Sequence, residues 1–278
     1  MFTVHRGPYP ARQRNPDTDM RTTPTDRPGS KTRVQVRTRW DDCDRYGHVN
    51  NAAYIALVRA AHDRAGMPAG ELRALEITYR EPVPLEVVVD VDVAVLEQGG
   101  SLRKIAYALR VDDRPAADAT VLWQLAGTPP TPELPPISRE VSGLPFRFLQ
   151  SVRSYQIGPD GAARPQAILQ WLEHAVFRAA VRAGWPRERM ESAAFVTYVV
   201  GHHLVLGQPA REGEELVVTS RLVDLRRVSG TWHHEIHASD GGLVAADRAR
   251  GVFLDLDGRP KPAPGELLDE LLRGEPPT

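Results

Sequence analysis

The sequence predicts an α+β protein made of two similar halves, in each of which a long apolar helix packs against an antiparallel sheet. Three observations support this prediction. A strand-like segment precedes a long apolar segment in each half, several strand-like segments follow it, and the sequence "RAGMP" at 64–68 recurs as "RAGWP" at 182–186. A repeat of about 115 residues is the length of a duplicated domain rather than of a solenoid unit.

The composition favours a small-molecule partner. The chain of 278 residues carries 35 Lys and Arg against 36 Asp and Glu, so no excess positive charge favours nucleic acid or an anionic membrane surface. A single cysteine, Cys43, excludes an internal disulfide framework. No secretory signal and no apolar segment of membrane-spanning length is visible. We therefore expect a cytoplasmic protein without nucleic-acid or membrane partners.

The first half begins after a polar, Pro-rich segment, residues 1–32, that is typical of a disordered tail. We assign residues 33–126 to the first domain. It opens with the alternating strand pattern "RVQVRTRW", followed by the apolar helix "AAYIALVRAAHDRAG", which Gly66 and Pro68 end. Alternating valines at 87–95 then predict a strand, and Gly99-Gly100 and "DDRP" turn the chain through an antiparallel meander.

The second half repeats this order after a stiff linker. Six prolines in "TPPTPELPPISREVSGLP" define the linker, residues 127–146, and leave 147–278 as the second domain. "RFLQSVRSY" is strand-like, and Pro165 opens a helix with an apolar stripe at Ile168, Leu172, Ala175 and Ala179. Strands are expected near 214–225, 229–238 and 243–255, and the C-terminal "APGELLDELLRGEPPT" predicts an amphipathic helix covering a sheet edge.

Polar and reactive residues concentrate in "DCDRYGHVNN", residues 42–51, directly before the first helix. The start of a buried helix offers free backbone N–H groups and the positive end of the helix dipole, which can stabilise an oxyanion. Asp42 or Asp44 could supply a base or nucleophile opposite it, and Gly47 would allow close approach of a ligand. The same residue types are also ordinary turn and N-cap residues, so the pattern alone leaves both interpretations open.

The extended sequence "DCDRYGHVNNAAY" resembles the signature of hot-dog-fold acyl-CoA thioesterases of the 4-hydroxybenzoyl-CoA thioesterase type. The resemblance implies tandem hot-dog domains, each a long central helix wrapped by an antiparallel sheet. It also implies that Asp44 is the catalytic carboxylate, as nucleophile or general base, and that the Asn51 backbone N–H polarises the thioester carbonyl. Gly47, His48, Asn50 and Tyr54 match the signature and would shape the substrate site. No metal or cofactor is implied.

The second half departs from this signature. It keeps an acidic residue, Glu173, in the helix where family members often carry one and the first half has Arg59. Gly158 or Ala162 stands where a counterpart of Asp44 would fall, and Asp160 is out of pattern. The resemblance to the tandem acyl-ACP thioesterases therefore implies a pseudo-dimer with a single working site. The expected substrate is an acyl-CoA or acyl-ACP, and such pseudo-dimers could form a homodimer.

Other functional readings stay open at this point. A hot-dog hydratase or dehydratase acting on an acyl thioester, and a non-catalytic acyl-thioester-binding protein, are the alternatives to hydrolysis. Cys43 lies near His48, but residues 43 and 44 of an extended segment face opposite sides, which disfavours a thiol nucleophile. His233, Glu235 and His237 share one strand face; we read them as the polar face of a sheet and not as a metal site.

Overall fold

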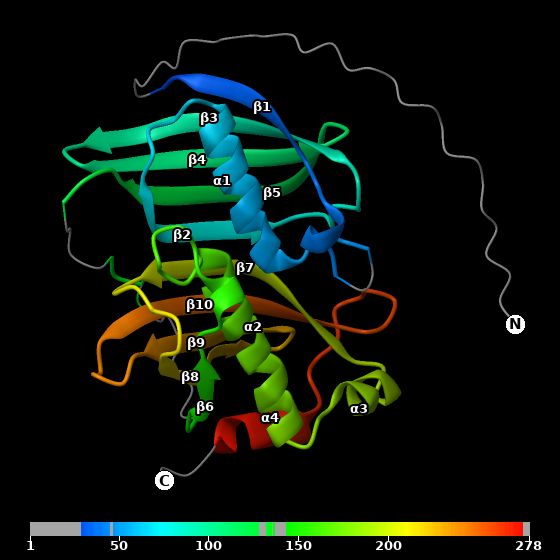
Figure 1. The fold of residues 1–278 in the computed structure, drawn as a ribbon. Coiled ribbons are helices and arrows are strands. Elements are labelled where there is room, and N and C mark those ends of the chain that lie inside the picture. The colour runs from blue at the N-terminus through cyan, green and yellow to red at the C-terminus, as the bar shows by residue number, and fades with distance from the viewer. Residues whose placement is uncertain (1–28, 45–46, 128–131, 135, 137–142, 275–278) are drawn as a thin grey trace, which may run out of the picture.

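A computed structural model describes residues 29–44, 47–127, 132–134, 136 and 143–274 (Figure 1). Most of the predicted tail and linker lies outside these residues. The helices are α1 (Tyr54–Arg64), α2 (Pro165–Arg182), α3 (Arg187–Ser192) and α4 (Gly265–Arg273), with short 3-10 helices η1 (Trp40–Asp42), η2 (Asn51–Ala53) and η3 (Ser154–Gln156). The strands are β1 (Lys31–Arg37), β2 (Glu71–Tyr79), β3 (Val88–Gly99), β4 (Leu102–Val111), β5 (Arg114–Gln124), β6 (Phe146–Ser151), β7 (Val196–Leu206), β8 (Glu215–Arg226), β9 (Ser229–His237) and β10 (Leu243–Leu254).

All ten strands form one antiparallel sheet in the order β1-β3-β4-β5-β2-β7-β10-β9-β8-β6. The two halves of this order mirror each other: each starts at an edge with its first strand and ends at the centre with the strand that follows its long helix. The central strands β2 and β7 pair with each other, with Ile77 opposite His202. Figure 1 shows α1 and α2 lying across the same face of the sheet, one over each half.

Most predicted elements are confirmed. Both long helices form, and Pro165 occupies the first turn of α2 as expected. The valines at 89, 91, 93 and 95 are buried along β3, and the four residues of the predicted stripe on α2 are buried. The β4–β5 turn places Asp112 and Asp113 at positive φ, which matches the twist of a tight hairpin.

Two predictions need correction. β1 begins at Lys31, inside the segment assigned to the tail, because residues 31–37 pair with β3. The C-terminal helix does not cover a sheet edge: α4 packs against α2 and β8, and the edge strands are β1 and β6. The pairing of β1 with β3 also buries a charge, because Lys31 and Arg33 pair with the carboxylate of Asp92 at 3.0 and 2.7 Å.

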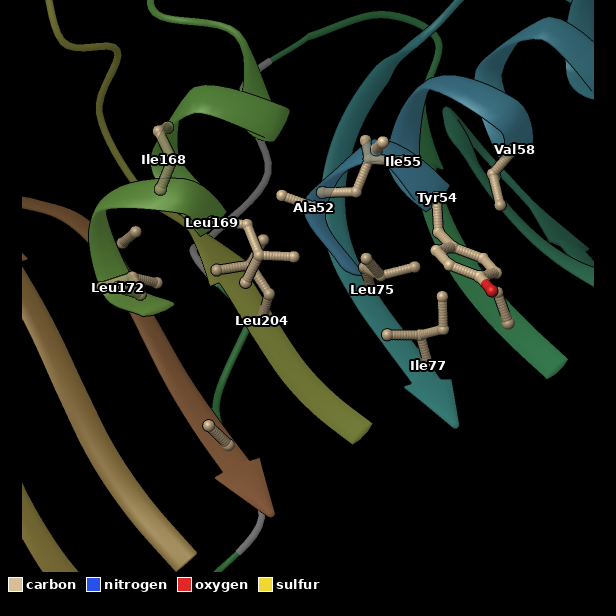
Figure 2. Packing of buried hydrophobic residues seen from close by; sticks show 14 of the residues in the cluster. Ala52, Tyr54, Ile55, Val58, Leu75, Ile77, Ile168, Leu169, Leu172 and Leu204 are labelled. Atoms are coloured by element: carbon tan, nitrogen blue, oxygen red, sulfur yellow. The ribbon is translucent and has the colours of Figure 1, made fainter. Parts of the chain in front are cut away.

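A single hydrophobic core runs through both halves. Ala52 and Ile55 at the start of the first helix lie beside Leu169 of α2, and Leu75 and Leu204 meet beneath them from the two central strands (Figure 2). The apolar core therefore continues across the junction between the halves. In the described residues, no helix has the length and apolarity needed to cross a membrane.

Candidate active site

The loop before η2 is closed by backbone hydrogen bonds. The carbonyl of Asp42 accepts a hydrogen bond from the Asn50 N–H at 2.9 Å. The backbones of Cys43 and Val49 form an isolated antiparallel β-bridge. The Asp42 side chain is buried and accepts a hydrogen bond from the Arg39 N–H at 2.9 Å. Asp42 is thus a structural cap, which leaves Asp44 as the carboxylate of the pair on the exposed side of the loop.

Asp44 and His48 face each other across the tip of this loop. The Asp44 N–H donates to the His48 carbonyl at 2.7 Å, and Asp44 Oδ1 accepts from the His48 N–H at 3.3 Å. Gly47 makes the turn possible, since its φ of +77° is costly for a residue with a side chain. Both hydrogen bonds use backbone atoms of His48, so the His48 main chain holds Asp44 in position.

The helix start beside this loop has a free donor. Asn50 is the N-cap of η2, and its Oδ1 accepts from the Ala52 N–H at 3.0 Å. The Asn51 carbonyl accepts from the Tyr79 hydroxyl at 3.1 Å, so both polar atoms of the 51–52 peptide are fixed. Within the part of the chain that the structure describes, the Asn51 N–H has no acceptor. This donor suits a carbonyl oxygen that gains negative charge.

Two tyrosines support the helix start from below. Tyr54 is buried, and its ring packs edge-on against Tyr79 with 5.1 Å between the ring centroids. Burial raises the pKa of Tyr54 to about 12 and raises the pKa of Tyr79 as well, so both hydroxyls are neutral. Tyr79 is a residue that the sequence pattern missed, because it ends a central strand that no alternation of polar and apolar residues revealed.

The thiol of Cys43 is poorly suited to nucleophilic attack. Burial raises its pKa, and the charges of Asp42 and Asp44 raise it further, so little thiolate forms near neutral pH.

On the outer face of the sheet, His233 Nε2 contacts Glu235 Oε1 at 2.9 Å. No set of three His, Cys, Asp or Glu side chains placed to hold a metal occurs in the described ranges.

The corresponding loop of the second half has the same backbone geometry without the reactive groups. Gly158 donates to the Ala162 carbonyl at 2.7 Å, as Asp44 does to His48, and Gly161 repeats the positive φ of Gly47. This pattern identifies Gly158, rather than Ala162, as the counterpart of Asp44. By the same register Pro165, which has no N–H, occupies the position of Asn51. The second loop thus has no carboxylate at the position of Asp44 and no N–H at the position of Asn51.

Comparisons with known proteins agree with this architecture. Residues 25–125 match the family model of the acyl-ACP thioesterase C-terminal domain, and residues 165–271 match that of the thioesterase-like superfamily. A search of curated protein sequences found no match.

Several solved structures share the fold over most of the chain. A putative oleoyl thioesterase from Lactobacillus plantarum has a TM-score of 0.64 at 15% identity, covering 81% of this chain and 96% of its own. An acyl-ACP thioesterase from Bacteroides thetaiotaomicron has a TM-score of 0.59 at 12% identity, covering 80% and 97%. The 12:0-ACP thioesterase from Umbellularia californica has a TM-score of 0.55 at 9% identity, covering 80% and 93%. The chain therefore has a hot-dog-like thioesterase fold, and each half matches a thioesterase family model.

Proposed function

We propose that this protein hydrolyses an acyl thioester, with Asp44 as the reacting carboxylate and the Asn51 N–H as the oxyanion donor. The observation that carries the proposal is the Asn51 N–H, which has no acceptor among the described residues and stands at a fixed helix start, one short loop away from Asp44. The matched family models, both of thioesterases, support the same reaction. The two halves would act as a covalent pseudo-dimer with one working site.

In the proposed reaction the thioester carbonyl oxygen accepts from the Asn51 N–H, at the positive end of the helix dipole. Asp44 either attacks the carbonyl carbon, forming a mixed anhydride that a water then hydrolyses, or removes a proton from a water that attacks the thioester directly; in both routes the C–S bond breaks. The leaving thiolate takes up a proton, which gives a free acid and a thiol. Gly47 and the main chain of His48 hold Asp44, while Asn50 and Tyr54 hold the helix start.

We propose that the end of the acyl chain enters an apolar cavity in the second half. The cavity has a volume of about 50 Å³ and lies between α2, the sheet and α4. Val176 lines it one turn of α2 after Glu173, Trp232 lines it from β9, and Leu271 lines it from α4. Its wall is almost entirely apolar, which favours an aliphatic chain. Phe177, the next residue on α2 after Val176, is 69% exposed and faces solvent.

The carrier could be CoA or acyl carrier protein, and both belong in the test. Thiol release is measured from CoA thioesters of graded aliphatic and aromatic acyl groups and from matching acyl-ACPs, with wild type, Asp44→Asn and Cys43→Ala. We expect release by wild type and Cys43→Ala and a loss of at least about 100-fold for Asp44→Asn. Ligand binding by wild type without thiol release from any substrate would contradict hydrolysis and favour a binding protein.

A further inference from the structure

The face of the sheet that α1 and α2 do not cover carries a polar cavity near its centre, the outer hollow. Side chains alternate along a strand, so Leu75 and Leu204 point toward the helices, while Glu76 and His203 between them point away (Figure 2). The outer hollow has a volume of about 170 Å³, against about 50 Å³ for the apolar cavity of the second half. Its polar lining consists of Glu76, Thr78, His203, Arg248 and Arg250. The proposed reaction uses none of these residues.

Gly201 leaves the floor of the outer hollow open. It pairs with Thr78 of β2 on one side and with Arg250 of β10 on the other, so this row of three residues has no side chain at its middle position. Neighbouring strands are about 4.8 Å apart, so roughly 10 Å separates the β2 side of the hollow from its β10 side. The parallel row beside it consists of Glu76, His203 and Arg248. The space above Gly201 is thus bordered by polar groups on both sides.

The two sides of the outer hollow differ in charge. Arg248 and Arg250 are about 7 Å apart along β10, and both side chains line the same space. Among the described residues, no carboxylate forms an ion pair with Arg250. The β2 side offers the Glu76 carboxylate and the Thr78 hydroxyl. The hollow therefore has a cationic side and a side that accepts hydrogen bonds.

Other acids near this part of the sheet already have partners. Asp118, opposite Thr78 on β5, pairs with Arg80 at 3.1 Å. Glu235 on β9 contacts His233 at 2.9 Å. Glu76 is thus the acidic side chain that lines the outer hollow itself.

The first half does not repeat the outer hollow. The pair of Glu76 and His203 lies at the centre of the strand order β5-β2-β7-β10, about which an approximate two-fold rotation relates the halves. The strand registers relate Gly201 to Ala74, Thr78 to Val205, Arg248 to Thr120 and Arg250 to Leu122. The counterpart of the hollow therefore has a side chain on its floor and no arginine. The two arginines are a feature of one half and not of the duplicated framework.

The lining suits a phosphate monoester with a hydroxyl group beside the phosphate. Such a phosphate carries a charge of about −1.5 to −2 near neutral pH, which two guanidinium groups balance. Its oxygens also accept the paired N–H donors that arginine presents. Glu76 repels the phosphate from the β2 side and accepts a hydrogen bond from the hydroxyl of the ligand. The charge difference across the hollow thus fixes the orientation of the ligand.

We propose that the outer hollow binds a phosphate monoester, with Arg248 and Arg250 on the phosphate and Glu76 on the adjacent hydroxyl. Binding at this site does not depend on the proposed hydrolysis. Two sources have this chemistry: the ribose of CoA, whose 3′-phosphate stands beside a 2′-hydroxyl, and a free phosphorylated metabolite. Thr78 precedes Tyr79, whose hydroxyl contacts the helix start, so the hollow lies near the strand end that a CoA thioester would pass.

The test measures binding by titration calorimetry, without turnover, for wild type, Arg248→Gln, Arg250→Gln and Glu76→Gln. Arg227→Gln, in the exposed β8–β9 turn, is the control, and thermal unfolding is measured for each protein. The probes are adenosine 3′-phosphate, its 2′-deoxy analogue and glycerol 3-phosphate. We expect each variant of the two arginines to weaken binding by at least about tenfold, because a charge-assisted pair is lost. Arg227→Gln should bind as wild type does.

Glu76 has its own readout in the matched nucleotides. Wild type should bind adenosine 3′-phosphate more tightly than its 2′-deoxy analogue, and Glu76→Gln should reduce that ratio. An equal ratio in both proteins would contradict the contact of Glu76 with the hydroxyl. No saturable binding of any probe by wild type, or equal affinities of wild type and folded Arg250→Gln, would overturn the site. A wild-type dimer that becomes a monomer in Arg250→Gln, measured by light scattering, would instead assign this face to a second copy of the chain.

Steady-state kinetics separates the two sources. If CoA is the ligand, Arg250→Gln raises KM for acyl-CoA severalfold and leaves KM for the matching acyl-pantetheine unchanged. If a free phosphate ester is the ligand, neither KM changes although binding of glycerol 3-phosphate weakens. Asp44→Asn is titrated in parallel and should bind all probes as wild type does. A failure of hydrolysis at Asp44 therefore leaves this inference standing, and a failure to bind leaves hydrolysis standing.

Discussion

Asn51 and Pro165 show how one residue decides whether a helix start can act on a carbonyl. Both follow loops with matching backbone hydrogen bonds, yet only Asn51 has an N–H to donate. A preorganised donor of this kind contributes about 2.7–4 kcal/mol to transition-state stabilisation in well-studied acyl-transfer enzymes. In the proposed mechanism, this contrast would leave one working site in a chain with two similar halves.

Tyr79 should matter for the rate although it does not contact the proposed carbonyl position. Tyr79→Phe removes the hydrogen bond to the Asn51 carbonyl and frees the peptide that follows the oxyanion donor. A hydrogen bond of this type contributes about 1 kcal/mol, so we expect kcat to fall about fivefold with little change in KM. Steady-state kinetics checks this, with the exposed Tyr155→Phe as control. An unchanged kcat would show that Asn50 alone fixes the helix start.

At the residue scale, the sequence predicted those site residues that lie within one short motif. Asp44, Asn51 and Gly47 lie within ten residues, so the loop that joins them is visible in the sequence. Tyr79 reaches the helix start beside this loop only through the position of β2 in the sheet. No spacing along the chain encodes such a contact.

At the scale of elements, the pairing of β2 with β7 joins the halves and depends on a glycine. A Cβ at Gly201 would lie 2.6 Å from the Ile77 carbonyl oxygen of the neighbouring strand. We expect Gly201→Ala to lower the free energy of unfolding by about 1–3 kcal/mol through this overlap. Urea unfolding measures the loss, and Gly99→Ala, with open space around its Cβ, is the matched control. Equal stability of the two variants would mean that the junction can shift without cost.

The helix α4 should set the length of acyl chain that the cavity accepts. Leu271 is buried and lines the cavity, whereas Leu272 on the same helix does not line it. Leu271→Ala removes three carbon atoms from the cavity wall, so we expect its preferred acyl-CoA to be longer than that of wild type. The ratio of kcat/KM across chain lengths checks this. The same shift in Leu272→Ala, or none in Leu271→Ala, would place the acyl chain elsewhere.

The sequence patterns do not predict the central strands β2 and β7. β3 alternates buried valines with polar residues and was predicted correctly, whereas β2 does not keep a period of two along its length. The pairing of β2 with β5 shifts register between Leu72 and Ala74, and an irregularity of this kind changes which residues face the core. Local periodicity does not reveal such a strand.

For the whole molecule, the buried pair of His202 and Asp247 predicts a loss of stability at alkaline pH. The folded pKa of His202, about 10, exceeds its unfolded value of 6.5, so its stabilising contribution is complete below pH 6.5 and is lost as the pH rises toward 10. We expect the urea midpoint of wild type to fall between pH 7 and 10. Asp247→Asn should be less stable at pH 7 and show a flatter decline, and parallel curves for the two proteins would contradict a charged His202.

The central claim is that hydrolysis uses the carboxylate of the first loop and none from the second. The most direct measurement compares kcat/KM for thiol release by Asp44→Asn and by Asp160→Asn, since Asp160 is the exposed aspartate of the second loop, where its Oδ1 accepts from the Ala162 N–H at 3.1 Å. The account predicts at least a 100-fold loss, roughly, for Asp44→Asn and a wild-type value for Asp160→Asn. Comparable losses in both variants, or full activity of folded Asp44→Asn, would contradict it.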